Sequence, residues 1–560
     1  MENVKQTLAS AIAALCENAF PASDAESWFE TPTDTKNGDL AFPCFRLAKT
    51  LRKPPAAIAA YLAENLRLPD DIEKAEPVNG YLNFFFRPSY YASLLNGLGD
   101  DTDLRESGKG KTVCIDFSSP NIAKKFHLGH IGTTMIGNAL RNMFAYCGWN
   151  VVAINYLGDW GTSFGKLICA YKMWSSREAI EKNGVIELER IYARFNKEAQ
   201  NDESLNQAAR DAFCALEEGN EEYREIWRYF REISLREYMK TYDLLGITFD
   251  SYNGESFYTD KMPAVVEELR EKGLLKLDDG ASVVDLSEYN MPPALILKRD
   301  GSTLYPTRDI AAAKWRKQEY NFDKCIYVTS AGQSLHFAQW FKVVELMGYD
   351  WASELVHVPY GTMSFGGEKL ASRTGNIIYL DDLLAQAIEK AEKIIDEKNA
   401  DLKDKHSTAV AVGVGAVVFN ALFNARIKDV DFSWDSALTF EGNTGPYLQY
   451  TYARASSVLR KCPDPGSPEG YSPNGDEIAL IKQLALFGSK VRLALEQYEP
   501  SVITRYLLDT CGYYNQFYHS SPVVRASGAE QNFRIKLTSA FRDTAGKCLE
   551  LLGMRRTEEI

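Results

Sequence analysis

Residues 112–147 constrain the fold most, because a strand pattern, a loop and a helix pattern follow one another there without a break. In residues 112–117 apolar and polar side chains alternate, and a turn of Ser, Ser, Pro and Asn follows, which predicts a buried strand. After His130 the apolar residues recur at helical spacing as far as Cys147, which predicts a helix over 131–147. This combination favours an anion site, because free backbone N–H groups and the helix dipole both attract phosphate.

Two histidines, His127 and His130, close this loop with Gly129 between them. One interpretation is half of a zinc site. Zinc needs further ligands, however, and the chain has only six histidines and no Cys-x-x-Cys pair. The other interpretation is a nucleotide site, in which the histidines donate hydrogen bonds to phosphate oxygens and Gly129 leaves room for the ligand. The nucleotide site is favoured, and no metal held tightly by protein ligands is expected.

A parallel sheet is predicted to continue from this strand. The run 151–156 forms a βαβ unit with it, and further strands are predicted at 325–329 and 355–358. A charged stretch over about 165–245 interrupts the pattern, and its rows of Glu, Lys and Arg are typical of solvated helix faces. Residues 106–380 are therefore predicted to form a Rossmann-like domain with a helical insertion. Ligands of such sheets bind at the carboxyl ends of the strands.

Two units of different composition flank this domain. Residues 1–105 combine helix patterns with an aromatic strand over 80–86, which predicts an α+β domain. An exposed Asn83 or Phe86 in that strand could contact an unpaired base of an RNA. Residues 381–560 carry helix patterns almost throughout, which predicts an all-α bundle. The fold class predicted for the whole chain is multidomain α/β.

The composition limits the partners. With 45% hydrophobic and 25% charged residues, the chain of 560 residues is an ordinary globular protein with several domains. The net charge of −13 argues against binding of nucleic acid through a general basic surface, so any RNA contact must be local. The N-terminus has no signal-peptide layout, the ten cysteines are scattered, and no stretch is expected to reach the length of an uncharged membrane span. A cytoplasmic enzyme without a membrane partner is predicted.

The motifs of these three units together resemble one enzyme family. The loop His127-Leu128-Gly129-His130, with a later Lys-x-x-Ser loop, is similar to the paired signatures of class I aminoacyl-tRNA synthetases. More specific blocks lie at 38–43, 117–124, 158–161, 254–258, 305–309, 333–337 and 442–450. In combination they resemble the arginyl-tRNA synthetases, and the resemblance runs from near residue 38 to the end of the chain.

The resemblance implies an arginine–tRNA ligase that works in two steps. ATP and L-arginine would form arginyl-adenylate and pyrophosphate, and the arginyl group would then pass to the 3′-terminal adenosine of tRNA(Arg). Activation of arginine is expected to require bound tRNA, Mg²⁺ is expected to accompany ATP, and the enzyme is expected to be a monomer. Residues 1–105 would bind tRNA, residues 381–560 would bind the anticodon, and no editing domain is expected.

The family motifs also assign site residues. Five residues match positions that surround arginine in the family: Asp116, Asn121, Tyr305, Asp309 and Gln333. Asp309 is the first choice for the guanidinium, which needs a carboxylate. A helix cap or a salt bridge is the alternative role for each aspartate. Six residues match ATP-binding positions: His127, Gly129, His130, Lys369, Ser372 and Arg373. The two histidines would donate to the phosphoryl oxygens, which gain negative charge during attack on the α-phosphate.

The second signature departs from the family pattern. It reads KLASR at 369–373, so Ser372 stands where the full motif has its second lysine. In arginyl enzymes that lack this lysine, one just upstream of the first histidine substitutes, and Lys124 has that place. Lys124 is therefore predicted to be catalytic together with His127 and His130, because its ammonium would supply the missing charge on the ATP phosphates.

Three other functions fit parts of the sequence. A class I synthetase for another amino acid would share the ATP site, but Tyr305 and Asp309 favour a cationic substrate. A small nucleotidylyltransferase uses a similar His-x-Gly-His loop and has no use for the flanking units. A catalytically inactive paralogue acting as an RNA-binding or scaffold protein would not be expected to keep His127, His130, Asn121 and Asp309.

Overall fold

The structure is a computed structural model that describes residues 2–32, 35–299, 301–365, 368–369, 378–462 and 465–560. The chain forms two compact units, each assembled from separate parts of the sequence. The first unit contains Met1–Asp100, Val458–Leu486 and Gly512–Phe541, and the second contains Asp101–Ser457, Phe487–Cys511 and Arg542–Ile560. The predicted fold class, a parallel-sheet domain preceded by an α+β part and followed by helices, is confirmed.

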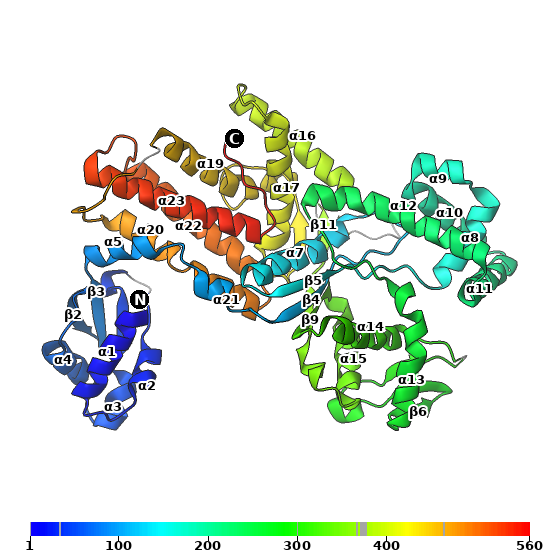
Figure 1. Cartoon of the computed structure of the whole chain (residues 1–560), viewed down its shortest axis with the longest axis horizontal. Helices are drawn as coiled ribbons and strands as arrows, with labels where there is room; N and C mark the ends of the chain where they lie inside the picture. Colours follow the sequence, from blue (N-terminus) through cyan, green and yellow to red (C-terminus); the bar gives the residue numbers. More distant parts are fainter. Residues whose placement is uncertain (1, 33–34, 300, 366–367, 370–377, 463–464) are drawn as a thin grey trace. The chain divides into compact units, whose positions relative to one another are not determined.

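The first unit contains a small antiparallel sheet of order β1-β3-β2, drawn in blue in Figure 1. The strands are β1 (Leu40–Pro43), β2 (Ile72–Val78) and β3 (Tyr81–Phe86). Its helices include α1 (Glu2–Leu15), α2 (Ala22–Trp28), α3 (Phe45–Leu51), α4 (Pro55–Asn65), α5 (Pro88–Gly97) and α20 (Gly475–Leu484). Asn79 and Gly80 form the two-residue loop of the hairpin between β2 and β3. Their φ values of 51° and 82° are both positive, as a tight two-residue hairpin loop requires.

The predicted exposure of Asn83 and Phe86 is wrong. Only 4% of each residue is exposed. Strand β3 is the central strand of its sheet, α4 packs against it, and Phe86 stacks on Tyr90 with 4.5 Å between the ring centroids. Alternation along a strand predicts two different faces, but here neighbouring elements cover both, so neither side chain is available to an RNA base.

A four-stranded parallel sheet of order β10-β9-β4-β5 forms the centre of the second unit (Figure 1). The strands are β4 (Thr112–Asp116), β5 (Asn150–Ile154), β9 (Lys324–Ser330) and β10 (Leu355–Tyr360), close to the four predicted runs. Asp116, the last residue of β4, lies beside Ile154 of β5 and Tyr327 of β9. The carboxyl ends of these strands therefore meet at one edge of the sheet.

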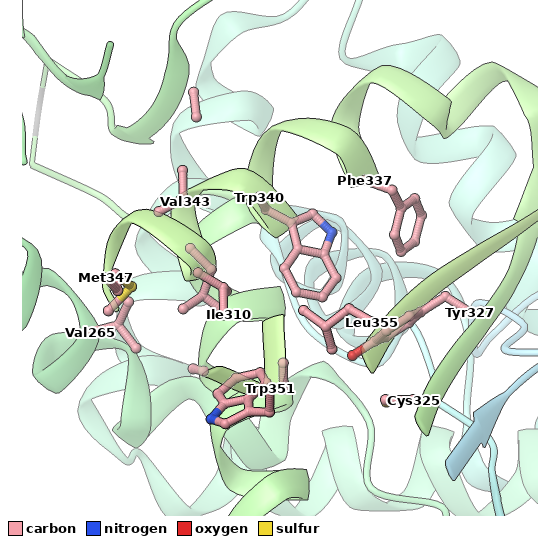
Figure 2. Packing of buried hydrophobic residues seen from close by; sticks show 14 of the residues in the cluster. Val265, Ile310, Cys325, Tyr327, Phe337, Trp340, Val343, Met347, Trp351 and Leu355 are labelled. Carbon is pink, nitrogen blue, oxygen red and sulfur yellow. The ribbon is translucent and has the colours of Figure 1, made fainter. Parts of the chain in front are cut away.

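Helices follow the strands and bury an aromatic core against the sheet. They include α7 (Ile131–Tyr146), α13 (Met262–Glu271), α14 (Tyr305–Tyr320) and α15 (Ser334–Leu346). Figure 2 shows Trp340 and Phe337 of α15 beside Tyr327 of β9 and Leu355 of β10. Trp340 is fully buried, and its ring centroid lies 5.3 Å from that of Tyr327. This packing holds the first turn of α15 beside the carboxyl end of β9.

The segment of about 165–245, predicted to be helical, consists of helices, and the structure describes all of its residues. Its helices are α8 (Thr162–Trp174), α9 (Arg177–Asn183), α10 (Val185–Glu198), α11 (Glu203–Glu218) and α12 (Glu221–Leu245). Asn220 caps α12 by accepting from the N–H of Tyr223, and Gly246 ends the helix with a φ of 70°. An antiparallel sheet follows, with strands β6 (Leu275–Asp278), β7 (Ala281–Val284) and β8 (Ala294–Leu297).

Helices dominate the chain after residue 380, as predicted. They include α16 (Leu380–Lys398), α17 (Lys405–Phe423), α19 (Gly445–Lys461), α21 (Phe487–Glu496), α22 (Ser501–Ser520) and α23 (Gly528–Leu551). A short strand, β13 (Val430–Phe432), pairs in parallel with β11 (Met363–Phe365).

The expectation that no stretch reaches the length of an uncharged membrane span is wrong for α17. Its 19 residues have the length and mean hydropathy of such a span. About two thirds of its most apolar window, 67%, is buried inside the protein, where α17 packs on α16 and α7. This burial is typical of a core helix, which passes the same test of length and composition.

Candidate active site

A cavity of about 500 Å³ lies at the carboxyl ends of β4 and β9. All five residues predicted to bind arginine line it: Asp116, Asn121, Tyr305, Asp309 and Gln333. His130 lines it as well. Ligands of parallel α/β sheets bind at this edge, so the cavity is the candidate active site.

Asp116 is already neutralised by a residue of the protein. Its Oδ2 lies 2.8 Å from Nη2 of Arg316, and its Oδ1 accepts a hydrogen bond from Ser119 Oγ at 2.8 Å. Arg316 is fully buried and lies 5.2 Å from the ring centroid of Tyr156. Burial by itself would lower the pKa of Arg316, but the charge of Asp116 raises it well above its usual value, so the guanidinium stays charged. The ion pair as a whole offers no net charge to a cationic substrate.

A second carboxylate, Glu255, lines the cavity and is not among the residues predicted from the sequence. Its Oε2 lies 2.9 Å from Nη1 of Arg308. Burial raises the pKa of Glu255 to about 7, against the opposing charge of Arg308 and with a contribution from the charge of Asp309. Glu255 lies inside the family block 254–258, so the block marked its neighbourhood, but no local pattern pointed to its side chain.

Asp309 differs from the other two carboxylates of the cavity. Among the described residues no Lys or Arg forms an ion pair with it; its Oδ2 lies 2.6 Å from Nε2 of His336. Unlike the guanidinium groups of Arg316 and Arg308, the imidazole of His336 carries no fixed positive charge, and its Nε2 can donate to the carboxylate. His336 is a further residue that the sequence analysis did not assign, although it lies in the block 333–337 at the start of α15.

The alternative role of Asp309 as a helix cap is excluded. Helix α14 begins at Tyr305, and its N-cap residue is Leu304, so Asp309 lies in the second turn. Tyr305, one turn earlier on the same helix, is 64% exposed. The helix thus presents an aromatic ring and a carboxylate to the same cavity, as their spacing of four residues requires.

The loop between β4 and the histidines is held in a strained conformation. Ser118, Ser119 and Ala123 have φ values of 69°, 45° and 61°, in the left-handed region that residues with a Cβ rarely adopt. Three side chains of α12 bind this loop. Ser234 Oγ accepts from the Ala123 N–H at 2.8 Å, and Tyr242 Oη lies 2.8 Å from Ser118 Oγ. Tyr238 Oη donates to the carbonyls of Asn121 at 2.7 Å and Lys124 at 2.6 Å. The helical insertion therefore sets the positions of residues 118–124.

The geometry makes His127 and His130 neutral hydrogen-bond donors. Nδ1 of His127 accepts from the N–H of Gly129 at 3.1 Å, and Nδ1 of His130 accepts from the N–H of His127 at 3.2 Å. An accepting Nδ1 leaves the ring hydrogen of His127 on Nε2, which can donate to a ligand. Nδ1 of His130 also lies 3.3 Å from the carbonyl oxygen of His127, to which the other neutral tautomer would donate. Burial, with a smaller effect of His127, lowers the pKa of His130 to about 3, and burial with the charge of Lys124 lowers that of His127.

Gly129 has a structural reason to lack a side chain. A Cβ at this position would lie 2.9 Å from the ring of His127, which is closer than real contacts allow. The ring of His127 is held there by its hydrogen bond from the Gly129 N–H. A larger residue would therefore displace His127 before any ligand is considered.

Lys124 lies three residues before His127 and is exposed. Among the described residues its ammonium forms no ion pair, but its charge is close enough to lower the pKa of His127. In the second signature, Ser372 and Arg373 lie outside the described residues. The backbone of Lys369 belongs to β12 (Glu368–Lys369), which pairs with β11. The assignment of these three residues to ATP stays a prediction.

Three family models match successive parts of the chain. The model described as tRNA synthetases class I (R), catalytic domain, matches residues 94–434. The arginyl tRNA synthetase N terminal domain matches residues 2–86, and the DALR anticodon binding domain matches residues 448–560. Together with the parallel sheet and the cavity at its carboxyl edge, these matches define a class I aminoacyl-tRNA synthetase.

Curated relatives and a solved structure narrow this class to one family. The arginine–tRNA ligase of Alkaliphilus metalliredigens (strain QYMF) is 45% identical over 538 residues, 95% of each chain. That of Clostridioides difficile (strain 630) is 46% identical over 544 residues, 96% of each chain. The arginyl-tRNA synthetase of Thermus thermophilus superposes with a TM-score of 0.82 at 27% identity, covering 100% of both chains. The chain therefore belongs to the arginyl-tRNA synthetases, confirming the resemblance, and it is an aminoacyl-tRNA ligase with the aminoacylation activity of that family.

Proposed function

We propose that the cavity at the carboxyl edge of the sheet carries out both steps of arginylation. In the first step a carboxylate oxygen of L-arginine attacks the α-phosphorus of ATP, and the bond to the bridging oxygen breaks as pyrophosphate leaves. In the second step the arginyl group passes from the adenylate to the 3′-terminal adenosine of tRNA(Arg). Bound tRNA is required before the first step. The observation that carries the proposal is the presence of an uncompensated carboxylate, Asp309, in the same cavity as His130.

Asp309 binds the guanidinium of arginine in this proposal. Asp116 and Glu255 each pair with an arginine of the protein, so the charge of Asp309 is the one left for a cation among the three carboxylates. A planar guanidinium matches a carboxylate through two parallel N–H bonds, which an ammonium cannot form. Tyr305 packs beside the bound group from the preceding turn of α14.

The other end of the substrate lies toward the histidines. Asn121 and Gln333 bind the α-amino and carboxylate groups, and Asp116 with its partner forms the wall at that end. Negative charge develops on the α-phosphoryl oxygens as the carboxylate attacks. The Nε2–H groups of His127 and His130 donate to these oxygens, and neutral donors in a buried position need little reorganisation.

Lys124 supplies the positive charge that the second signature lacks at Ser372. Its ammonium contacts the phosphate oxygens of ATP. Lys369, Ser372 and Arg373 also bind the nucleotide. Gly129 lets the adenosine approach the loop. ATP enters as its magnesium complex, because Mg²⁺ is bound by phosphate oxygens and water and needs no cage of protein ligands.

Residues 106–380 form the catalytic domain in this scheme, residues 1–105 bind tRNA, and residues 381–560 bind its anticodon. A cavity of about 440 Å³ among the C-terminal helices supports the last assignment. Tyr450 in its wall is 37% exposed, and the guanidinium of Arg454 lies 4.9 Å from its ring centroid. Aromatic rings next to cations suit the stacking of an unpaired base. The enzyme acts as a monomer in the cytoplasm.

Pyrophosphate exchange tests the proposal directly. The full chain is assayed with ATP and each amino acid in turn, with and without tRNA. Exchange is expected with arginine and in the presence of tRNA. Exchange that depends on lysine or glutamate instead of arginine would overturn the assignment of the cavity.

The affinity for arginine is expected to depend on pH through Glu255. Its pKa is raised to about 7, so it is charged at pH 8 and protonated at pH 6, where the charge of Arg308 is left unbalanced and repels the substrate. The KM for arginine should rise about tenfold from pH 8 to pH 6, following the fall in the ionised fraction. Glu255→Gln mimics the protonated state, so its KM should be high and nearly constant over this range. A variant that keeps the pH dependence of the wild type would assign the titration to another group.

A further inference from the structure

The first signature segment is paired with the chain that follows the second signature. The N–H of Leu128 donates to the carbonyl of Ile378 at 2.9 Å, and the N–H of Leu380 donates to the carbonyl of Phe126 at 2.8 Å. His127 and Tyr379 face each other as an antiparallel bridge. The two stretches are about 250 residues apart in sequence, so this pairing fixes the distance between two loops that the sequence leaves independent.

One carboxylate of the helical insertion contacts both stretches. Oε1 of Glu189, on α10, accepts from the N–H of Lys125 at 2.6 Å, and its Oε2 accepts from Tyr379 Oη at 3.2 Å. The bond from Lys125 is a backbone bond directly before the paired residues 126–128. Glu189 thus contacts the first signature segment with one oxygen and the stretch that follows the second signature with the other.

The side chain of Lys125 closes the same cluster. Its ammonium lies 3.0 Å from Oδ2 of Asp381 and 4.3 Å from the ring centroid of Tyr379. Only 17% of the Lys125 side chain is exposed. Glu189, Lys125, Tyr379 and Asp381 are called the signature clamp below. No residue of the clamp lines the arginine cavity.

An exposed ion pair contributes little to stability, so the clamp could be a surface feature without consequence. Its geometry argues otherwise. The carboxylate of Glu189 makes two bonds to two segments distant in sequence, one of them to a backbone N–H, and such bonds restrict position more than a flexible ion pair does.

We propose that Glu189 is a positioning residue for the activation step, which holds the chain after the second signature against the first. The proposal rests on the proposed function, in which the two signatures bind the ATP phosphates. The effect of Glu189 should therefore appear in the use of ATP and leave the binding of arginine unchanged, because the arginine cavity is built from other residues.

The test compares Glu189→Ala with Glu198→Ala in tRNA-dependent pyrophosphate exchange. Glu198 lies on the same helix and forms an exposed ion pair with Arg194, so it is a matched control. Glu189→Ala should raise the KM for ATP or lower kcat by about tenfold, the effect of losing a hydrogen bond to a charged group, while the KM for arginine stays within about twofold. Equal behaviour of the two variants, or an equal rise in both KM values, would overturn the proposal.

Two milder variants keep the proposal falsifiable if Glu189→Ala does not fold. Glu189→Gln retains an acceptor for the Lys125 N–H and should recover part of the loss. Tyr379→Phe removes only the bond to Oε2, so adding it to Glu189→Ala should cause no further loss. Full additivity of these two substitutions would contradict a shared role.

Hydrogen exchange tests the signature clamp without an activity assay. The Leu380 amide should exchange hydrogen faster in Glu189→Ala than in Glu198→Ala, because its bond to Phe126 depends on the clamp. Unchanged exchange would overturn the proposal. Failure of the proposed function is a different result, since the wild-type enzyme would then show no arginine-dependent exchange of pyrophosphate at all.

Discussion

Replacement of Asp309 by asparagine is expected to lower kcat/KM for arginine by about 30-fold to several thousand-fold in pyrophosphate exchange. The range corresponds to the roughly 2–5 kcal/mol lost when one member of a desolvated charge pair is removed. The reason lies in the charge balance of the cavity. Arg316 compensates Asp116 and Arg308 compensates Glu255, so no other carboxylate of this set can replace Asp309.

The loss should fall mainly on the KM for arginine, because the guanidinium lies far from the bond that is made and its contact is similar in the ground and transition states. The KM for ATP should change little. Asp260→Asn is the control, because its carboxylate is 76% exposed and belongs to a local ion pair with Lys261. A KM for arginine within about twofold of the wild type in Asp309→Asn would remove Asp309 from the binding site.

Replacement of Lys124 by alanine is expected to lower kcat of activation by about 10²–10³-fold, the usual effect of removing one donor from a developing negative charge. Lys124 is exposed, and its charge reaches the histidines of the loop, since it lowers the pKa of His127. Lys124→Arg keeps the charge and should recover part of the rate. The KM for arginine should stay close to that of the wild type.

The loss in Lys124→Ala should greatly exceed that in Lys125→Ala, and equal, mild effects would remove Lys124 from the mechanism. Lys125 is an imperfect control, however, because its ammonium is engaged with Asp381 and Tyr379. Lys182→Ala is cleaner, since Lys182 is exposed on the helical insertion. Its exchange rate should match that of the wild type.

Local sequence patterns were sufficient to predict the strand and the helix that flank the site. The alternation in 112–117 and the helical spacing after His130 coincide with β4 and α7. The structure buries both faces of β4 and every residue from Ile131 to Leu140 of α7, as is usual for a central strand of a parallel sheet and the helix that covers it. The same patterns failed for Asn83 and Phe86. A period of two separates the faces of a strand, but it carries no information on which elements cover each face.

The expectation about the length of apolar stretches failed for a related reason. Helix α17 has one Lys, Lys405 at its first position, and is long enough for a span, but its burial against α16 and α7 is a property of the packed chain. Composition alone measures how apolar a helix is. Whether that helix lies among other helices depends on contacts with residues elsewhere in the chain.

The sequence by itself determined the four strands of the parallel sheet, the family and five of the residues that gather at the carboxyl edge of this sheet. Such residues stand next to turns and strand ends, where local chemistry marks them. Only the tertiary structure decided which carboxylate of the cavity has no arginine as its partner. The pairs of Asp116 with Arg316 and of Glu255 with Arg308, and the contact of His336 with Asp309, join separate elements, so their effect on charge follows no sequence spacing. Packing brings these groups together, and burial makes their charges matter.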